Sequence, residues 1–236
     1  FANPSAISRS EAEKEQLAEV LQEVGLIVPV IEDAAYRELW FEAPWPARSI
    51  LALEAFEPFP RLYCGTLTKP FASGLKIGYL HASSPAIFER MLWLKGHQDF
   101  GSAHFNQAIL EHVIRSGGFD AFLARLRPGY ASKMDTLDRA LEEAGLRALG
   151  WRWERPAGGL YLWVRAPEGV STELNGPLWK ACVEEEVMYV PGGLCIAGPA
   201  DSRHVRLSFG VLDHAALREA AARFARAARR AAPRRA

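Results

Sequence analysis

Residues 66–69, Thr-Leu-Thr-Lys, place a lysine among small hydroxyl side chains directly after an apolar stretch. A lysine that is desolvated enough to lose its proton can attack an aldehyde carbon. The hydroxyls of Thr66 and Thr68 could hydrogen-bond a phosphate group beside it. A lone loop lysine is more often only solvated, so a chemical role for Lys69 needs support from other residues.

Asp33, Tyr36 and Asn3 are further candidates. Asp33 comes directly after the apolar run Leu26–Ile31, and a carboxylate at the end of a buried strand needs a partner such as a protonated ring nitrogen. The simpler interpretation is an N-cap for the next segment. Tyr36 could donate a hydrogen bond to a phenolic oxygen, or be an ordinary half-buried tyrosine. Asn3 could reach the same oxygen, or Asn3-Pro4 could be only a turn.

These residues occur in motifs whose order is that of a known family. Asn3-Pro-Ser-Ala6, Glu32-Asp-Ala-Ala-Tyr36 and Thr66–Lys69 with Gly74-Leu-Lys-Ile-Gly-Tyr79 together resemble the class I/II aminotransferases, which are fold type I pyridoxal-phosphate enzymes. The resemblance covers only the C-terminal part of that family and is nearest to the 2-aminoadipate and aromatic aminotransferases and the MocR-type regulators. It continues in three later segments, Pro156–Trp163, Val190–Gly193 and Val205–Phe209.

The resemblance implies a role for each candidate residue. Lys69 is the catalytic residue and carries pyridoxal 5′-phosphate as a Schiff base, and Arg206 binds the substrate carboxylate, whose shape fits a planar guanidinium. The other implied cofactor contacts are Asn3, Asp33, Tyr36, Thr66, Thr68 and Lys76. The candidate set contains no metal ligand, because His97, His104 and His112 have no carboxylate or cysteine that completes a site.

Two of these positions depart from the family pattern. Ala6 stands where the family has glycine, so we expect the backbone there to take a different path. Lys76 stands where the family has arginine, which keeps the charge but loses the bidentate fork. We also expect the family's phosphate loop, and the aromatic residue that stacks on the cofactor ring, to lie upstream of Phe1.

The predicted activity is the transfer of an amino group from an amino acid to a 2-oxo acid, by a homodimer. The main alternative is a pyridoxal-phosphate-binding effector domain of a MocR-type transcription regulator, with nucleic acid as a partner only if an upstream DNA-binding domain exists. Other chemistry on the same scaffold, such as β-lyase activity, and a cofactor-free homologue are further alternatives.

The elements that must position these residues indicate an α/β fold with two domains. Residues 1–145 are predicted to be a partial cofactor-binding large domain with a mostly parallel sheet and helices, and residues 146–236 a smaller α+β domain. The expected strands of the first domain are Leu26–Ile31, Ser49–Ala55, Arg61–Cys64 and Leu75–Leu80, and its later helices are Ala86–His97, Ala103–Arg115 and Phe119–Ala144.

Five elements are expected in the second domain: a strand pair within Trp151–Arg165, a helix over Leu174–Glu185, strands over Val187–Val190 and Val205–Val211, and a helix from Ala215. The composition adds few constraints. Lys plus Arg and Asp plus Glu number 28 each, so no net charge points to nucleic acid or a membrane. Three irregularly spaced cysteines and no apolar run of spanning length predict a cytoplasmic protein.

Overall fold

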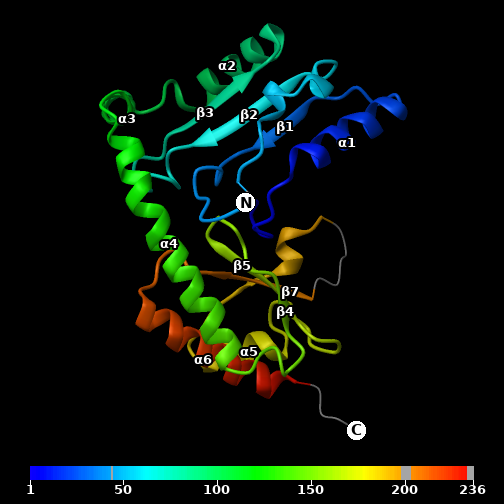
Figure 1. Ribbon diagram of the computed structural model, residues 1–236, viewed down its shortest axis with the longest axis vertical. Coiled ribbons are helices and arrows are strands. Elements are labelled where there is room, and N and C mark those ends of the chain that lie inside the picture. Colours follow the sequence, from blue (N-terminus) through cyan, green and yellow to red (C-terminus); the bar gives the residue numbers. More distant parts are fainter. Residues whose placement is uncertain (44, 198–202, 233–236) are drawn as a thin grey trace. The chain divides into compact units, whose positions relative to one another are not determined.

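The computed structural model describes residues 1–43, 45–197 and 203–232. The chain forms two compact units (Figure 1). The amino-terminal unit comprises Ala2 and residues 7–127, and the carboxy-terminal unit comprises Phe1, residues 3–6 and residues 128–236. Their boundary falls inside the long helix α4 (Gly118–Glu143), near Pro128. The two predicted domains, 1–145 and 146–236, remain a prediction.

The amino-terminal unit is built on a three-stranded sheet with the order β1-β2-β3. β1 (Val30–Asp33) and β2 (Arg61–Thr66) are parallel, whereas β3 (Gly78–Ala82) is antiparallel to β2. The helices of this unit are α1 (Glu11–Glu23), α2 (Pro85–Asp99), α3 (His104–Arg115) and the first part of α4. The predicted strand at 61–64 and the helices at 86–97, 103–115 and 119–144 are thus confirmed to within a few residues.

The predicted strand over Ser49–Ala55 is wrong. This segment forms two short 3-10 helices, η1 (Ile50–Ala52) and η2 (Glu54–Phe56). Its first turn is set by Ser49, whose hydroxyl accepts a hydrogen bond from the backbone N–H of Leu51 at 3.2 Å. The apolar residues of this segment pack with Phe59 against Ala18 of α1, so they form a small core rather than a sheet.

The expected buried strand over Leu26–Ile31 is also wrong in position and in burial. Pro29 has no N–H to donate to a neighbouring strand, and β1 begins only after it, at Val30. Successive side chains of β1 point to opposite faces. Val30 packs against the core around Ala18, whereas Ile31 is 64% exposed. The strand expected at 75–80 likewise begins late, at Gly78, because Lys76 has a left-handed backbone with φ of +53°.

Glu32 connects three elements of this unit. Its carboxylate pairs with Lys14 Nζ of α1 at 2.9 Å, with the two side chains only 14% and 12% exposed. The same carboxylate accepts hydrogen bonds from the hydroxyl of Ser49 at 2.6 Å and from the N–H of Ile50 at 3.0 Å. Burial opposes ionisation of Glu32, but the hydrogen bonds from Ser49 and Lys14 outweigh it, and the pKa of Glu32 is lowered.

The carboxy-terminal unit contains a four-stranded antiparallel sheet with the order β4-β5-β7-β6. One face of this sheet supplies Leu162, Val164, Val205 and Leu207 to the core. The strands are β4 (Arg152–Trp153), β5 (Tyr161–Arg165), β6 (Val190–Pro191) and β7 (His204–Ser208), and η3 (Gly192–Cys195) follows β6. The predicted strand pair around Gly158-Gly159 is confirmed, whereas β6 and β7 are shorter than expected.

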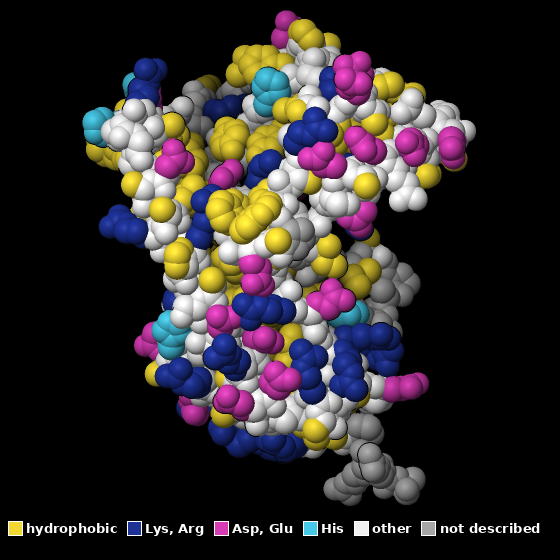
Figure 2. Space-filling model, in the orientation of Figure 1, with side chains coloured by type: hydrophobic (Ala, Val, Ile, Leu, Met, Phe, Trp, Pro, Cys, Tyr) yellow, Lys and Arg dark blue, Asp and Glu magenta, His cyan; other side chains and the backbone are white. Residues whose placement is uncertain are grey.

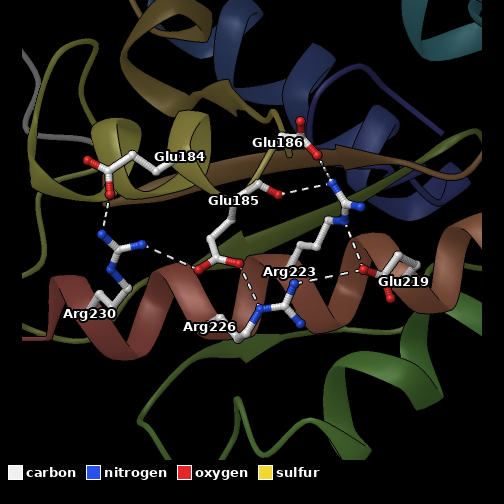
Figure 3. A network of polar contacts seen from close by, with 7 residues as sticks. All are labelled: Glu184, Glu185, Glu186, Glu219, Arg223, Arg226 and Arg230. Atoms are coloured by element: carbon white, nitrogen blue, oxygen red, sulfur yellow. Dashed lines mark hydrogen bonds and ion pairs between the residues drawn. The ribbon is translucent and has the colours of Figure 1, made fainter.

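Two helices complete this unit with the second part of α4. α5 (Pro177–Glu184) starts later than predicted because Pro177 occupies its first turn, where a missing N–H costs nothing. α6 (His214–Ala231) is capped by Asp213, which accepts a hydrogen bond from the N–H of Ala216. Ion pairs join the end of α5 to α6 through Glu184, Glu185, Glu186, Arg223, Arg226 and Arg230, and Glu219 pairs with Arg223 within α6 (Figure 3).

The surface carries both signs of charge. On the face drawn in Figure 2, Lys and Arg side chains are interspersed with Asp and Glu, in keeping with the equal numbers in the sequence. No helix in the described part of the chain combines the length and the apolar character needed to span a membrane.

The part-buried position of Glu32 predicts an effect on stability. Replacing it by alanine leaves Lys14 without its carboxylate and with only the carbonyl of Arg48 as an acceptor, so Glu32→Ala should lower the free energy of unfolding by about 2 kcal/mol in urea titrations at pH 7. The matched control is Glu111→Ala, which removes an exposed pair with Arg115 and should change that energy by less than about 0.5 kcal/mol.

The same substitution also predicts a pH dependence. The folded-state pKa of Glu32 lies below the ordinary value of 4.5, so its stabilising contribution is complete above that value and is lost as the pH falls through the folded pKa. The difference between the unchanged chain and Glu32→Ala should therefore shrink in acid. A difference that stays the same between pH 7 and about pH 3 would contradict the role of the ionised carboxylate.

Candidate active site

Polar residues of the first two strands meet at one edge of the amino-terminal sheet. Because β1 and β2 are parallel, their carboxyl ends lie at the same edge, where open α/β sheets bind ligands. Asp33 ends β1 opposite Cys64, and Thr66 ends β2. Lys69 follows in the loop after β2. The structure thus places Asp33 and Thr66 at the ends of neighbouring strands and Lys69 near Tyr36. The functional roles of these four residues stay predictions.

Lys69 is exposed, and its ammonium group lies 5.9 Å from the centroid of the Tyr36 ring. Within the described residues it makes no hydrogen bond or ion pair. The loop around it is nevertheless held in place. The N–H of Phe71 bonds the carbonyl of Leu67 at 3.1 Å, and the Phe71 ring packs edge-on against Phe122 of α4 at 5.1 Å. Lys69 therefore lies in a fixed loop, and its amine makes no hydrogen bond or ion pair with the described residues.

Asp33 and Tyr36 have opposite exposure. Tyr36 is only 9% exposed, whereas Asp33 is exposed, so the expectation of a buried aspartate is wrong for the described residues. One carboxylate oxygen of Asp33 accepts a hydrogen bond from the N–H of Ala35 at 3.1 Å and closes a turn rather than capping a helix. The exposure of Asp33 follows from strand alternation, since the neighbouring Glu32 occupies the covered face.

The three residues predicted to contact a phosphate differ in the hydrogen bonds that their side chains already make within the fold. Thr66 donates its hydroxyl proton to the carbonyl of Ile77 at 3.0 Å and accepts from the N–H of Thr68 at the same distance. The hydroxyl proton of Thr66 is therefore already used in a hydrogen bond that supports the loop. The hydroxyl of Thr68 and the ammonium of Lys76 make no hydrogen bond in the described part of the chain.

Two supports of this loop were not found from the sequence. The ring of Tyr79 lies directly over Gly65, where a Cβ atom would come within 2.3 Å of the ring carbon Cζ. Only glycine fits there without moving that ring. Asn106 of α3 donates its side-chain amide to the carbonyl of Leu75 at 3.0 Å and supports the segment that carries Lys76. Both depend on contacts between segments distant in sequence.

Arg206 lies on β7 in the carboxy-terminal unit, with Trp163 of β5 and Val190 of β6 as its cross-strand partners. Its Nη1 atom donates to Oδ1 of Asn3 at 2.6 Å, and its guanidinium lies 4.4 Å from the centroid of the Tyr161 ring. Its Nε atom is buried and has no hydrogen-bond partner, and no acidic residue of the described chain pairs with it. A partly buried cation without a counterion is suited to bind a carboxylate.

Residues 3–6 pack against the turn between β4 and β5. A Cβ atom at Gly159, where φ is +81°, would lie 3.4 Å from Cβ of Phe1 and 3.8 Å from that of Ala6. The Asn3-Pro4 peptide bond is cis. Ala6 is buried and adopts φ of +57°, in the left-handed region that glycine favours. The alanine thus keeps a glycine-like backbone conformation.

Comparisons with known proteins show which family the chain belongs to. The family model for aminotransferase class I and II matches residues 1–224. The 2-aminoadipate transaminase of Thermus thermophilus is 32% identical over 228 residues, which are 96% of this chain and 55% of that protein. The crystal structure of LysN from the same organism, an alpha-aminoadipate aminotransferase complexed with N-(5′-phosphopyridoxyl)-L-leucine, is 28% identical with a TM-score of 0.84, and the match covers 96% of this chain and 56% of that one.

A regulator also matches. An uncharacterized HTH-type transcriptional regulator of Bacillus subtilis, YdfD, is 28% identical over 211 residues, or 89% of this chain and 41% of the regulator. The chain therefore spans about half the length of the relatives that it matches. The structural matches confirm the predicted fold class, an α/β fold corresponding to about half of a fold type I aminotransferase.

The left-handed backbone of Ala6 predicts unequal effects of two substitutions. Ala6→Gly should change the free energy of unfolding by less than about 1 kcal/mol, because relief of about 1–2 kcal/mol of strain is offset by a lost buried methyl and a more flexible unfolded chain. Ala6→Val should destabilise by about 2 kcal/mol or more, since a β-branched residue fits neither the backbone nor the contact with Gly159. Urea titrations check both, and equal stability of the two variants would contradict a left-handed residue 6.

Proposed function

Because the chain belongs to the class I and II aminotransferase family, we propose that it transfers an amino group from an amino acid to a 2-oxo acid with pyridoxal 5′-phosphate as cofactor. One observation carries the proposal: Lys69, which makes no hydrogen bond or ion pair with the described residues, lies at the carboxyl ends of two parallel strands beside the buried Tyr36. The chain spans about half the length of its relatives, so the proposal concerns the part of the site that these residues supply.

The residues of the amino-terminal unit fit this cofactor by their chemistry. Lys69 has an amine that can bind an aldehyde carbon. Asp33 has a carboxylate oxygen not used by its turn, which suits a protonated ring nitrogen, and Tyr36 has a phenol suited to a ring oxygen. Thr68 and Lys76 have a hydroxyl and an ammonium group suited to a phosphate, whereas Thr66 would first have to release Ile77. For Asn3, a cofactor contact rests on the family resemblance alone.

Each group then has a defined task in the reaction. The cofactor, when bound, supplies an electron sink that makes the substrate Cα–H acidic. Lys69, once its amine is free, would take the proton from Cα as general base and then donate that proton as general acid. Arg206 holds the substrate carboxylate through the parallel N–H donors of its guanidinium. We also propose a homodimer in the cytoplasm, on the resemblance and on the three free cysteines.

The second candidate is the effector domain of a MocR-type regulator, favoured by the match to a transcriptional regulator of Bacillus subtilis. Such a domain would bind the cofactor and an amino acid through the same residues without releasing a 2-oxo acid. Detection of 2-oxo acid after single-turnover mixing with amino acids therefore separates the two candidates. Turnover supports the transaminase, whereas a spectral change without product supports the regulator.

Lys69 gives the most direct test of cofactor binding. The chain reconstituted with pyridoxal 5′-phosphate should show an absorbance band in the visible or near-ultraviolet that survives gel filtration and shifts when amino acids are added. Lys69→Ala should lose this band and fall in turnover by at least about 100-fold, because the amine is both the attachment point and the proton carrier. Lys95→Ala is the matched control, since Lys95 is paired with Asp99 on the surface of α2. A colourless unchanged chain would refute the proposal.

Arg206 gives a separate test of substrate binding. Arg206→Ala should weaken amino-acid binding by about 100-fold, the equivalent of roughly 2.7 kcal/mol for a charge-assisted bidentate contact, and leave the cofactor band intact. Arg165→Ala, an exposed arginine on the same sheet, should change neither. Absorbance titrations measure both affinities, and an equal loss of cofactor and amino acid would reject Arg206 as the carboxylate anchor.

A further inference from the structure

The guanidinium of Arg206 is oriented by neutral groups only. In the described residues its Nη1 atom donates to the amide oxygen of Asn3, its Cζ atom lies 4.4 Å from the ring centroid of Tyr161, and no carboxylate is paired with it. An acidic partner would hold the guanidinium more strongly, but it would also occupy the donors that a substrate carboxylate needs. An aromatic ring does not compete in this way, because it attracts the cation with its π face and has no carboxylate oxygen to occupy the N–H donors.

The strand register brings the Tyr161 ring and Arg206 together. Trp163 is the residue directly opposite Arg206, and Tyr161 lies two positions before it on β5, opposite Ser208. Residues two apart on a strand share a face, so Tyr161 is the diagonal neighbour of Arg206, within reach of a long side chain. Trp163 stacks instead on His204, at a centroid distance of 4.9 Å and an interplanar angle of 4°. Each of the two aromatic residues thus has its own cationic or imidazole partner.

We propose that Tyr161 is a positioning residue for substrate binding: its ring holds the Arg206 guanidinium in one plane and leaves the in-plane N–H donors free for the substrate carboxylate. An unsupported arginine side chain loses considerable rotamer freedom when it is immobilised by a ligand. The ring removes that loss before the ligand arrives. This inference rests on the proposed function, since it concerns the carboxylate anchor of the same site.

The test compares a carboxylate with a ligand of the same shape that lacks the charge. Isocaproate and isocaproamide have no amino group, so they bind without reacting, and calorimetric titration of the full chain with each of them requires no turnover. Tyr161→Leu should weaken isocaproate binding about tenfold and leave isocaproamide binding unchanged. Tyr161→Phe, which keeps the ring, should stay within about twofold of the unchanged chain. Trp163→Leu is the matched control and should have little effect on either ligand.

A second measurement covers the case in which Tyr161→Leu fails to fold. Pentafluorophenylalanine at position 161 has nearly the shape of phenylalanine but a reversed ring quadrupole, so it should weaken isocaproate binding relative to Tyr161→Phe. Equal binding by these two chains, or an equal loss of both ligands in Tyr161→Leu, would overturn the inference. Failure of the unchanged chain to prefer isocaproate to isocaproamide would overturn it together with the role of Arg206. Intact carboxylate preference without turnover would instead refute the proposed function alone.

Discussion

The part-buried carboxylate of Glu32 fixes which way β1 faces, and the candidate site depends on that orientation. Glu32 binds Lys14 of α1 and the first turn of η1, so this face of β1 is covered. Strand side chains alternate with a period of two, and a slip of one residue would exchange the faces. Asp33 is therefore held on the open face, at the end of the strand. Glu32, with a structural role, and Asp33, with a candidate functional role, are consecutive in the sequence, and the strand places their side chains on opposite faces.

In the carboxy-terminal unit, strand register rather than an ion pair determines which side chains face away from the core. Leu162, Val205 and Leu207 supply one face of its sheet to the core, which leaves the alternate residues of β5 and β7 for the other face. Arg206 and Tyr161 meet there because of the pairing between these strands. The segment that carries Asn3 reaches Arg206 by packing on Gly159, and the left-handed Ala6 lies in that contact.

Periodicity predicted the regular elements, and tertiary contacts decided the rest. The apolar stripe of α4 is evident from the sequence, and Leu123, Met134 and Leu141 of that stripe are buried. A short apolar run such as residues 50–56 has no period that separates a strand from a helical turn, and the hydroxyl of Ser49 decided its form. The exposure of Asp33 could not be predicted, because burial depends on which elements pack on each face of a strand.

The candidate site residues were predictable to different degrees for the same reason. Lys69, Tyr36 and Arg206 stand in ordered motifs, so their identity is visible in the sequence. Three other features are cross-strand or strand-to-loop contacts: the hydrogen bond from Thr66 to Ile77, the packing of the Tyr79 ring over Gly65, and the contact of the Tyr161 ring with Arg206. Such contacts require the register of strands that are 11 to 45 residues apart in the chain. Their roles therefore emerge only from the fold.

Lysine and arginine side chains have two distinct roles in this chain. Lys14 is part-buried and paired with Glu32, and Arg127 is partly buried between Glu38 and the Trp40 ring, so both charges stabilise the fold. Lys69 and Arg206 have no acidic partner in the described residues. This difference matters chemically. A carboxylate beside Lys69 would engage the amine that has to attack a carbon, and one beside Arg206 would compete with the substrate. The fold instead places Lys69 in a loop held by backbone and ring contacts, and it orients Arg206 with the amide of Asn3 and the ring of Tyr161.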